Sequence, residues 1–175
     1  MTMMDPIGAM TSLVRQLEKP WNPRVQVTPE YYDYVALPEN EFFAGMDVVT
    51  KYILDTQHCF NSPTFLDVGC GMGTKMFLAQ RLGYSVHGID IHQEYLDSAR
   101  TLVNGSYPEL CNAFDYEYYD QFDVVYAYHP CIFHKLQHSL NELIASKMRP
   151  GALFFLAGTK LDTHKNVEDQ VWLIE

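Results

Sequence analysis

Five residues that follow a short apolar run could bind a polar or anionic ligand through their main chain. Gly69-Cys70-Gly71-Met72-Gly73 comes directly after Thr64–Val68, and a helical pattern begins at Thr74. Glycine adopts backbone angles that other residues resist, and it lets a ligand lie against the backbone. The first turn of the helix would point free N–H groups and the positive end of its dipole at that ligand. The pattern therefore predicts a site for a carboxylate or phosphate at this turn.

An acid, Asp90, ends the next apolar run. It lies about 20 residues beyond the glycines, where a carboxylate can accept hydrogen bonds from both hydroxyls of a ribose. The dinucleotide fingerprint G-x-G-x-x-G is matched only in part, because Thr74 takes the position of the third glycine. Thr74 therefore counts against a nucleotide-dependent oxidoreductase, although the pair of turn and acid predicts a nucleoside ligand.

The elements that position these residues alternate between strand and helix. Apolar runs typical of strands lie at 64–68, 84–89, 122–128 and 152–157, with a weak one near Leu110. Apolar residues with helical spacing lie at 74–82, 93–103 and 136–148, and earlier at Phe42, Met46, Val49 and Ile53. This alternation predicts an α/β fold with a doubly wound, mostly parallel sheet and helices on both faces. Ligands of such sheets bind beyond the carboxyl ends of the strands.

The chain divides at about residue 60. Residues 1–60 join a helical pattern at 5–18 to a breaker at 19–23 and a segment rich in Tyr and Pro, and we interpret them as a lid or cap. Residues 61–175 form one compact α/β unit. Only 17 residues follow Gly158, so we expect a sheet truncated after its fifth strand, with one short strand at most in 171–175. The edge left exposed would suit a homodimer.

The amino-acid composition indicates which classes of partner the protein binds and in which cellular compartment it works. Of 175 residues, 47% are apolar, and 22 acidic residues against 12 basic ones give a net charge of −10. Because Lys and Arg do not cluster, we do not expect a nucleic-acid partner. No apolar stretch approaches the roughly 18 residues of a membrane helix. Residues 1–10 show no basic patch followed by an apolar run, so we expect no secretory signal. The scattered cysteines predict free thiols and a cytoplasmic protein; they are Cys59, Cys70, Cys111 and Cys131.

Four segments, in order, resemble the class I S-adenosylmethionine-dependent methyltransferases. Phe65–Gly73 and Val86–Asp90 resemble that family's glycine turn and acidic second strand. Phe122–Val125 is similar to its fourth strand, and Leu143–Leu153 is similar to its next helix, turn and fifth strand. The resemblance covers residues 64–158. It implies a Rossmann-like domain, S-adenosylmethionine as the cofactor, and methyl transfer to a small-molecule or protein acceptor.

The resemblance also implies which residues hold the cofactor. The glycines would lie under its methionine part, Asp67 near its amino group, and Asp90 on its ribose. Asn112 stands where the family often carries an acid near adenine, and its carbonyl can still accept a hydrogen bond; Asp115 is a rival for this role. The full set of cofactor residues is Asp67, Gly69, Cys70, Gly71, Gly73, Asp90, Ile91, Asn112, Ala113 and Tyr126.

Candidates for catalysis follow the fourth predicted strand. Methyl transfer from a sulfonium requires alignment and exclusion of water, and a base only where the acceptor is protonated. Tyr128 and His129 stand where the family faces the methyl group, and the ordinary pKa of histidine lies near neutrality. Pro130-Cys131 resembles the nucleophilic pair of cytosine ring-carbon methyltransferases, but the residues around it do not match.

Two alternatives concern metal and activity. His134 and His138 would share a helix face, but no further ligand completes a known spacing, so we expect no metal site. No acceptor motif is recognisable, which leaves open a non-catalytic module with a degenerate methyltransferase fold that binds S-adenosylmethionine or serves in interactions.

Overall fold

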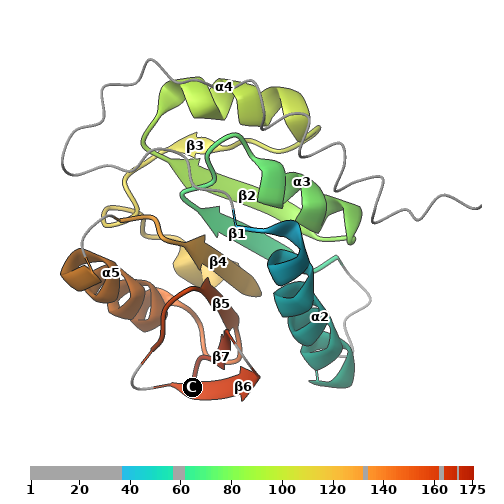
Figure 1. The fold of residues 1–175 in the computed structure, drawn as a ribbon, viewed down its shortest axis with the longest axis vertical. Coiled ribbons are helices and arrows are strands. Elements are labelled where there is room, and N and C mark those ends of the chain that lie inside the picture. Colours follow the sequence, from blue (N-terminus) through green and yellow to red (C-terminus); the bar gives the residue numbers. More distant parts are fainter. Residues whose placement is uncertain (1–36, 57–61, 132–133, 162–163, 169) are drawn as a thin grey trace, which may run out of the picture.

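Seven strands make up the central sheet of the chain. The computed structural model describes residues 37–56, 62–131, 134–161, 164–168 and 170–175 (Figure 1). The predicted helical pattern at 5–18 and most of the segment rich in Tyr and Pro lie outside the described residues. The strands are β1 (Thr64–Val68), β2 (Ser85–Asp90), β3 (Glu109–Leu110), β4 (Val124–Tyr128), β5 (Leu153–Ala157), β6 (Lys165–Glu168) and β7 (Val171–Leu173).

The strand order is β3-β2-β1-β4-β5-β7-β6. The first five strands pair in parallel, whereas β7 runs antiparallel to both β5 and β6. The order reverses between β1 and β4, so the carboxyl ends of these strands flank the position where ligands of such sheets bind. The predicted α/β class with a doubly wound, mostly parallel sheet is confirmed.

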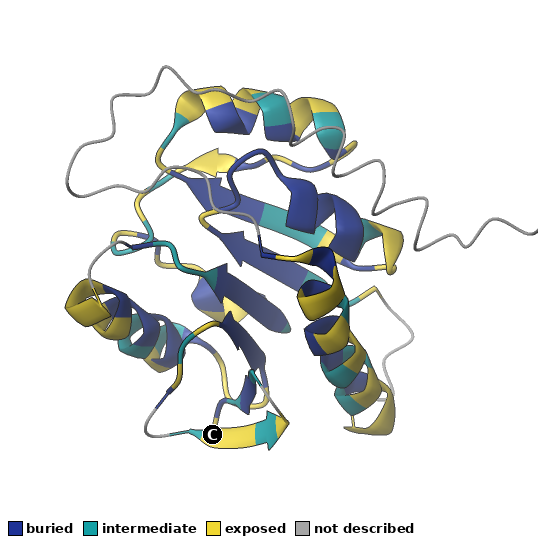
Figure 2. Ribbon diagram, in the orientation of Figure 1, coloured by how far each residue is buried: buried dark blue, intermediate teal, exposed yellow. Residues whose placement is uncertain are grey.

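The prediction that the sheet ends after its fifth strand is wrong. Val171–Leu173 pairs with β5, with Phe155 opposite Val171, and β6 adds a further strand outside it. The apolar pattern missed β6 because its side chains are mostly exposed, whereas β1, β4 and β5 are buried almost throughout (Figure 2). The edge of β5 on which the homodimer prediction rested is therefore paired within the chain.

Helices cover both faces of the sheet, as predicted (Figure 1). They are α2 (Glu39–Thr56), α3 (Thr74–Arg81), α4 (Gln93–Leu102) and α5 (His134–Lys147), with a 3₁₀ turn, η1 (Tyr119–Gln121). Phe42 of α2, Met76 of α3 and Leu96 of α4 belong to one core, and Leu140 and Ile144 of α5 belong to the other. Among the described residues, no helix combines the length and apolarity that crossing a bilayer requires.

Helix α2 packs directly on the sheet through aromatic rings and a glycine. The ring of Phe42 lies 5.3 Å from that of Tyr126 and 5.9 Å from that of Phe155, measured between centroids. Gly45 lies on the ring of Phe155, so that a Cβ added there would be 2.1 Å from Cζ. The absence of a side chain at Gly45 therefore sets how closely α2 approaches β5.

We expect the Gly45→Ala substitution to destabilise the fold. Helix propensity alone would favour alanine by about 1 kcal/mol, but the added methyl group overlaps the Phe155 ring, and overpacking of this kind costs about 1–3 kcal/mol. Urea unfolding would measure the difference. Asp47→Ala, on the exposed side of the same helix, should change stability by less than about 0.5 kcal/mol. A Gly45→Ala protein more stable than the wild type would contradict this packing.

Candidate functional site

Main-chain hydrogen bonds join the turn after β1 to the end of β2. The N–H groups of Gly69 and Cys70 both donate to the carbonyl oxygen of Ile89, at 2.9 and 3.0 Å. Gly69, Gly71 and Gly73 have φ angles of 77°, 50° and 79°. This left-handed region favours glycine, so the turn requires all three glycines for its own conformation.

The carboxylate of Asp90 closes this junction. Its Oδ2 accepts the N–H of Gly71 at 2.9 Å, and its Oδ1 accepts the N–H of His92 at the same distance. The Nδ1 of His92 lies 3.2 Å from the same Oδ1. Each carboxylate oxygen can accept more than one hydrogen bond, so Asp90 holds the turn and keeps capacity for the hydroxyls of a ligand.

Buried charges lie beneath the turn. Asp67 on β1 is 2% exposed, and burial raises its pKa to about 7; the nearby Lys75 ammonium opposes this shift, and the Asp90 carboxylate adds to it. Lys75 is also buried, in the first turn of α3. The sequence analysis did not identify Lys75, because no local pattern indicated that it faces Asp67. A further positive group here would favour the ionised form of Asp67.

The adenine residues implied by the resemblance lie beside the end of β2. The N–H of Cys111 donates to the carbonyl oxygen of Asp90 at 3.0 Å, which brings Asn112 and Ala113 to this edge. Asn112 is exposed, and its Oδ1 accepts the N–H of Phe114 at 3.0 Å. The rival Asp115 lies in the same turn, since its N–H donates to the carbonyl of Asn112. Ile91 is 36% exposed, so it offers an apolar surface next to the carboxylate.

Two of the glycines also allow close packing around the site. A Cβ at Gly73 would be 2.8 Å from the Cβ of Ala99, so Gly73 lets α3 approach α4. A Cβ at Gly69 would be 3.3 Å from the Cβ of Pro130, so the segment after β4 lies next to the glycine turn. The structure therefore brings together the two regions that the sequence analysis assigned to cofactor and acceptor.

His129 is held in an unusual conformation at the end of β4. Its φ is 43°, and among the described residues it alone combines a positive φ with a side chain beyond glycine. Its ring lies 4.7 Å from that of Tyr128, and a Cβ at Gly158 would be 2.5 Å from its Nε2. Such a conformation costs about 1–3 kcal/mol and persists only where the surroundings enforce it. Gly158, at the end of β5, provides the space for this ring.

A chain of buried amides fixes the segment after β4. Gln137 accepts the N–H of Cys131 at 3.2 Å and donates to Asn141 at 2.7 Å, and Asn141 donates to the hydroxyl of Thr159 at 3.0 Å. These bonds tie the segments after β4 and β5 to α5. The sequence signal was two amides four residues apart on the inner face of a helix, and the sequence analysis missed it.

Three side chains considered in the sequence analysis are buried rather than exposed at the site. The ring of Tyr126, which was assigned to the cofactor, packs in the core 6.0 Å from Phe65. The side chain of Cys70 is buried against Gly88, where an added Cβ would be 2.9 Å from Sγ, so Cys70 offers only its main chain. Burial raises the pKa of Cys131 to about 11, and a neutral, buried thiol does not suit a nucleophile.

Ionisation of Asp67 should lower the free energy of unfolding as the pH rises. The folded state keeps a proton to about pH 7 that the unfolded chain releases near pH 4. This contribution to stability is complete below about pH 4 and is lost through pH 7, by on the order of 1 kcal/mol per pH unit. Asp67→Asn stays neutral and should remove the loss, as urea unfolding at several pH values would show. Asp97→Asn, on the exposed side of α4, should keep the wild-type slope; the same slope in both variants would contradict the assignment.

Comparison with known proteins finds a matching family model and structures with a similar fold. Residues 65–151 match the family model described as a methyltransferase domain, whereas no curated protein sequence matches the chain. An RNA methyltransferase from Salinibacter ruber, in complex with S-adenosyl-L-homocysteine, has a TM-score of 0.59 and 16% identity over 80% of this chain and 94% of that one.

Two further structures are similar. An amino pentose methyltransferase from Micromonospora echinaspora, with S-adenosylmethionine bound, has a TM-score of 0.55 and 15% identity over 75% of this chain. The plantazolicin methyltransferase, in complex with a triazolic analog and S-adenosyl-L-homocysteine, has a TM-score of 0.53 and 15% identity over 87% of this chain. The chain spans 61% and 53% of the lengths of these two proteins. At these identities the structures establish the fold.

Proposed function

We propose that the chain is a class I S-adenosylmethionine-dependent methyltransferase, since residues 65–151 match the methyltransferase-domain family model and methyltransferases share its fold. In this proposal it binds S-adenosylmethionine at the turn after β1 and transfers the methyl group to a small-molecule or protein acceptor. The observation that carries the proposal is the junction of the glycine turn with Asp90, through the 2.9 Å bond from the Gly71 N–H. It places a carboxylate and a glycine-rich main-chain turn at the carboxyl ends of neighbouring strands, where a nucleoside can bind.

The residues at this edge fit the parts of the cofactor. Asp90 retains acceptor capacity for the ribose hydroxyls, and the exposed Ile91 suits the adenine ring. The glycine turn and the first turn of α3 would lie under the methionine part, whose carboxylate suits a helix N-terminus. Asp67 is a buried acid whose pKa stays raised despite the nearby Lys75 ammonium, and a cationic amino group, directly or through water, would favour its ionised form. Asn112 and Ala113 would also contact the adenine ring.

The protein's own contribution to the reaction is alignment. S-adenosylmethionine supplies a methyl group that its sulfonium already activates, so the protein must orient the acceptor and exclude water. We assign this role to His129, which is held in its conformation by Gly158 and lies one residue before the contact of Pro130 with Gly69. Tyr128 packs against its ring. Where the acceptor carries a proton, the imidazole of His129 would take it.

The proposal also covers the class of the methyl acceptor and the cellular location of the protein. The net charge of −10 favours a small molecule or a protein over a nucleic acid, because nucleic-acid binding depends on clustered positive charge. Cys70, Cys111 and Cys131 are free cysteines, which supports a cytoplasmic location. We keep the proposal that residues 1–60 cap the domain 61–175, with α2 as the part of this cap that packs on the sheet. A homodimer stays a prediction for sedimentation to test.

Calorimetric titration with S-adenosylmethionine, and separately with S-adenosylhomocysteine, tests the proposal. We expect both to bind, and Asp90→Ala to weaken both at least about tenfold, since loss of charge-assisted hydrogen bonds costs about 1.5–3 kcal/mol. Asp90→Asn keeps an acceptor for the Gly71 N–H and should fall between the wild type and alanine. Asp97→Asn serves as the control on exposed helix surface.

The result of this titration distinguishes a methyltransferase from a non-catalytic module. No binding of either compound by a folded wild-type protein would leave the non-catalytic module as the function. Binding that is unchanged in Asp90→Ala would show that the ligand does not use the end of β2.

Substitution of His129 should separate binding from transfer. We expect His129→Ala to bind S-adenosylmethionine with wild-type affinity, because the side chain faces the acceptor end, but to incorporate labelled methyl groups into its acceptor about 10²–10⁴ times more slowly. A screen of candidate acceptors with labelled cofactor would measure this. His138→Ala, an exposed position on α5, should behave as the wild type; equal transfer by both variants would exclude a role for His129.

A further inference from the structure

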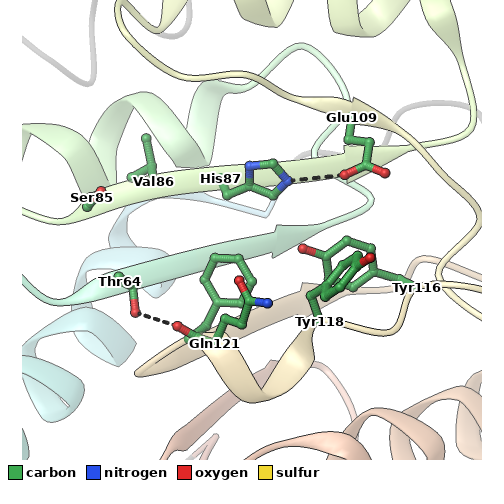
Figure 3. A pocket seen from close by; sticks show the side chains of 9 residues that line it. Thr64, Ser85, Val86, His87, Glu109, Tyr116, Tyr118 and Gln121 are labelled. Carbon is green, nitrogen blue, oxygen red and sulfur yellow. Dashed lines mark hydrogen bonds and ion pairs between the residues drawn. The ribbon is translucent and has the colours of Figure 1, made fainter.

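A hollow lies on the sheet face that carries α5. Its volume is about 470 Å³, within the range of small-molecule sites. The residues that line it are Thr64, Ser85, Val86, His87, Glu109, Tyr116, Tyr118, Gln121 and Phe122 (Figure 3). Tyr116 and Phe122 belong to the core on the α5 side, and the ring of His87 stacks near both, at 6.4 and 5.9 Å between centroids.

This hollow is separate from the glycine turn. Thr64 and Ser85 are the first residues of β1 and β2, whereas the turn lies beyond the last residues of these strands. None of the residues that we assign to the cofactor or to the acceptor lines it. The hollow therefore begins at the opposite end of β1 and β2, and it extends along β2 to Glu109, which pairs with Ile89.

Among the described residues, no helix covers this part of the sheet, and the hollow lies there. The chain passes from β3 to β4 through residues 111–123, which hold one 3₁₀ turn, η1. Helices α3 and α4 pack on the other face. Side chains of the short segment, above all Tyr116, Tyr118 and Phe122, cover β2 in place of a helix and leave space between them.

One negative charge faces this space without a full partner. Glu109 is the only acid among the nine described residues that line the hollow, and its side chain is 51% exposed. Its Oε2 lies 3.7 Å from Nε2 of His87, beyond hydrogen-bond distance. Burial lowers the pKa of His87, although the Glu109 carboxylate opposes this shift, so burial disfavours the charged imidazole that would neutralise the carboxylate.

Aromatic faces complete the lining. The rings of Tyr116 and Tyr118 stand almost perpendicular, at 80°, with centroids 5.7 Å apart, so they form a corner beside Glu109 (Figure 3). Tyr118 is 54% exposed and so is open to a ligand, whereas Tyr116 is 4% exposed and offers only the part of its ring that lines the hollow. The face of a tyrosine ring attracts a cation, and a nearby carboxylate adds to that attraction.

We propose that this hollow is a second ligand site that binds a small organic ammonium ion, with Glu109 as the counter-ion and the rings of Tyr116 and Tyr118 as its walls. The site goes beyond methyl transfer and does not depend on the cofactor assignment. A neutral ligand of the same shape would lose the attraction of both the carboxylate and the rings, so charge selects the ligand.

Choline and its neutral isostere, 3,3-dimethylbutan-1-ol, test the proposal by NMR titration of the full chain. We expect choline to shift the ring signals of Tyr116 and Tyr118 and to bind at least about tenfold more tightly than the isostere. Protein saturated with S-adenosylmethionine should bind choline with the same affinity. Equal affinity for both probes, no binding by the folded protein, or displacement of choline by S-adenosylmethionine would each overturn the proposal.

Matched variants locate the site. Glu109→Gln and Tyr118→Ala change exposed side chains and should each weaken choline binding by about fivefold or more. Glu117→Gln and Tyr107→Ala are the controls, because both positions are exposed and neither lines the hollow. Binding of choline that is equally strong in Glu109→Gln and Glu117→Gln would show that the carboxylate is not its counter-ion. Titration of all four variants with S-adenosylmethionine separates this result from a failure of the cofactor site.

Discussion

The structure depends on the junction between the turn after β1 and the end of β2. Buried N–H groups must find acceptors, and those of Gly69 and Cys70 share the carbonyl oxygen of Ile89, while that of Gly71 bonds to Asp90. Because Val68 pairs with Ile89 in the parallel register of β1 and β2, these acceptors stand directly beside the turn. The same junction places the start of α3, the carboxylate and the segment after β3 at one edge of the sheet. The proposed cofactor site is thus a consequence of how two strands end.

Positions without side chains set the distances between the layers. Gly45 lets α2 lie on Phe155, Gly73 lets α3 approach Ala99 of α4, and Gly88 leaves room for Cys70. Gly158 does the same for His129, whose backbone has a positive φ at the end of β4. Each of these contacts joins residues far apart in the chain, so the precision of the site rests on packing rather than on the turn alone.

The two faces of the sheet are covered unequally. Helices α2, α3 and α4 pack on one face, and α5 with the short segment between β3 and β4 packs on the other. The fully covered face holds the aromatic core that includes Tyr126, which explains why this residue is not at the ligand edge. The less covered face holds the hollow beside Glu109. One sheet thus offers two chemically different places, a polar edge for a nucleoside and an aromatic, acidic hollow for a cation.

The sequence by itself determined the elements whose signals are local. Apolar runs and helical spacing predicted β1, β2, β4, β5 and the described helices, and glycines followed by an acid predicted the turn and its ligand edge, because these patterns need no distant partner. Strand β6 was missed because its exposed, polar residues carry no apolar period, and its place depends on β7. Lys75 beside Asp67, Gly158 against His129, the buried face of Tyr126 and the meeting of His87 with Glu109 were decided only by tertiary structure. Each depends on strand register and on which face of the sheet a helix covers, and these are properties of the assembled layers.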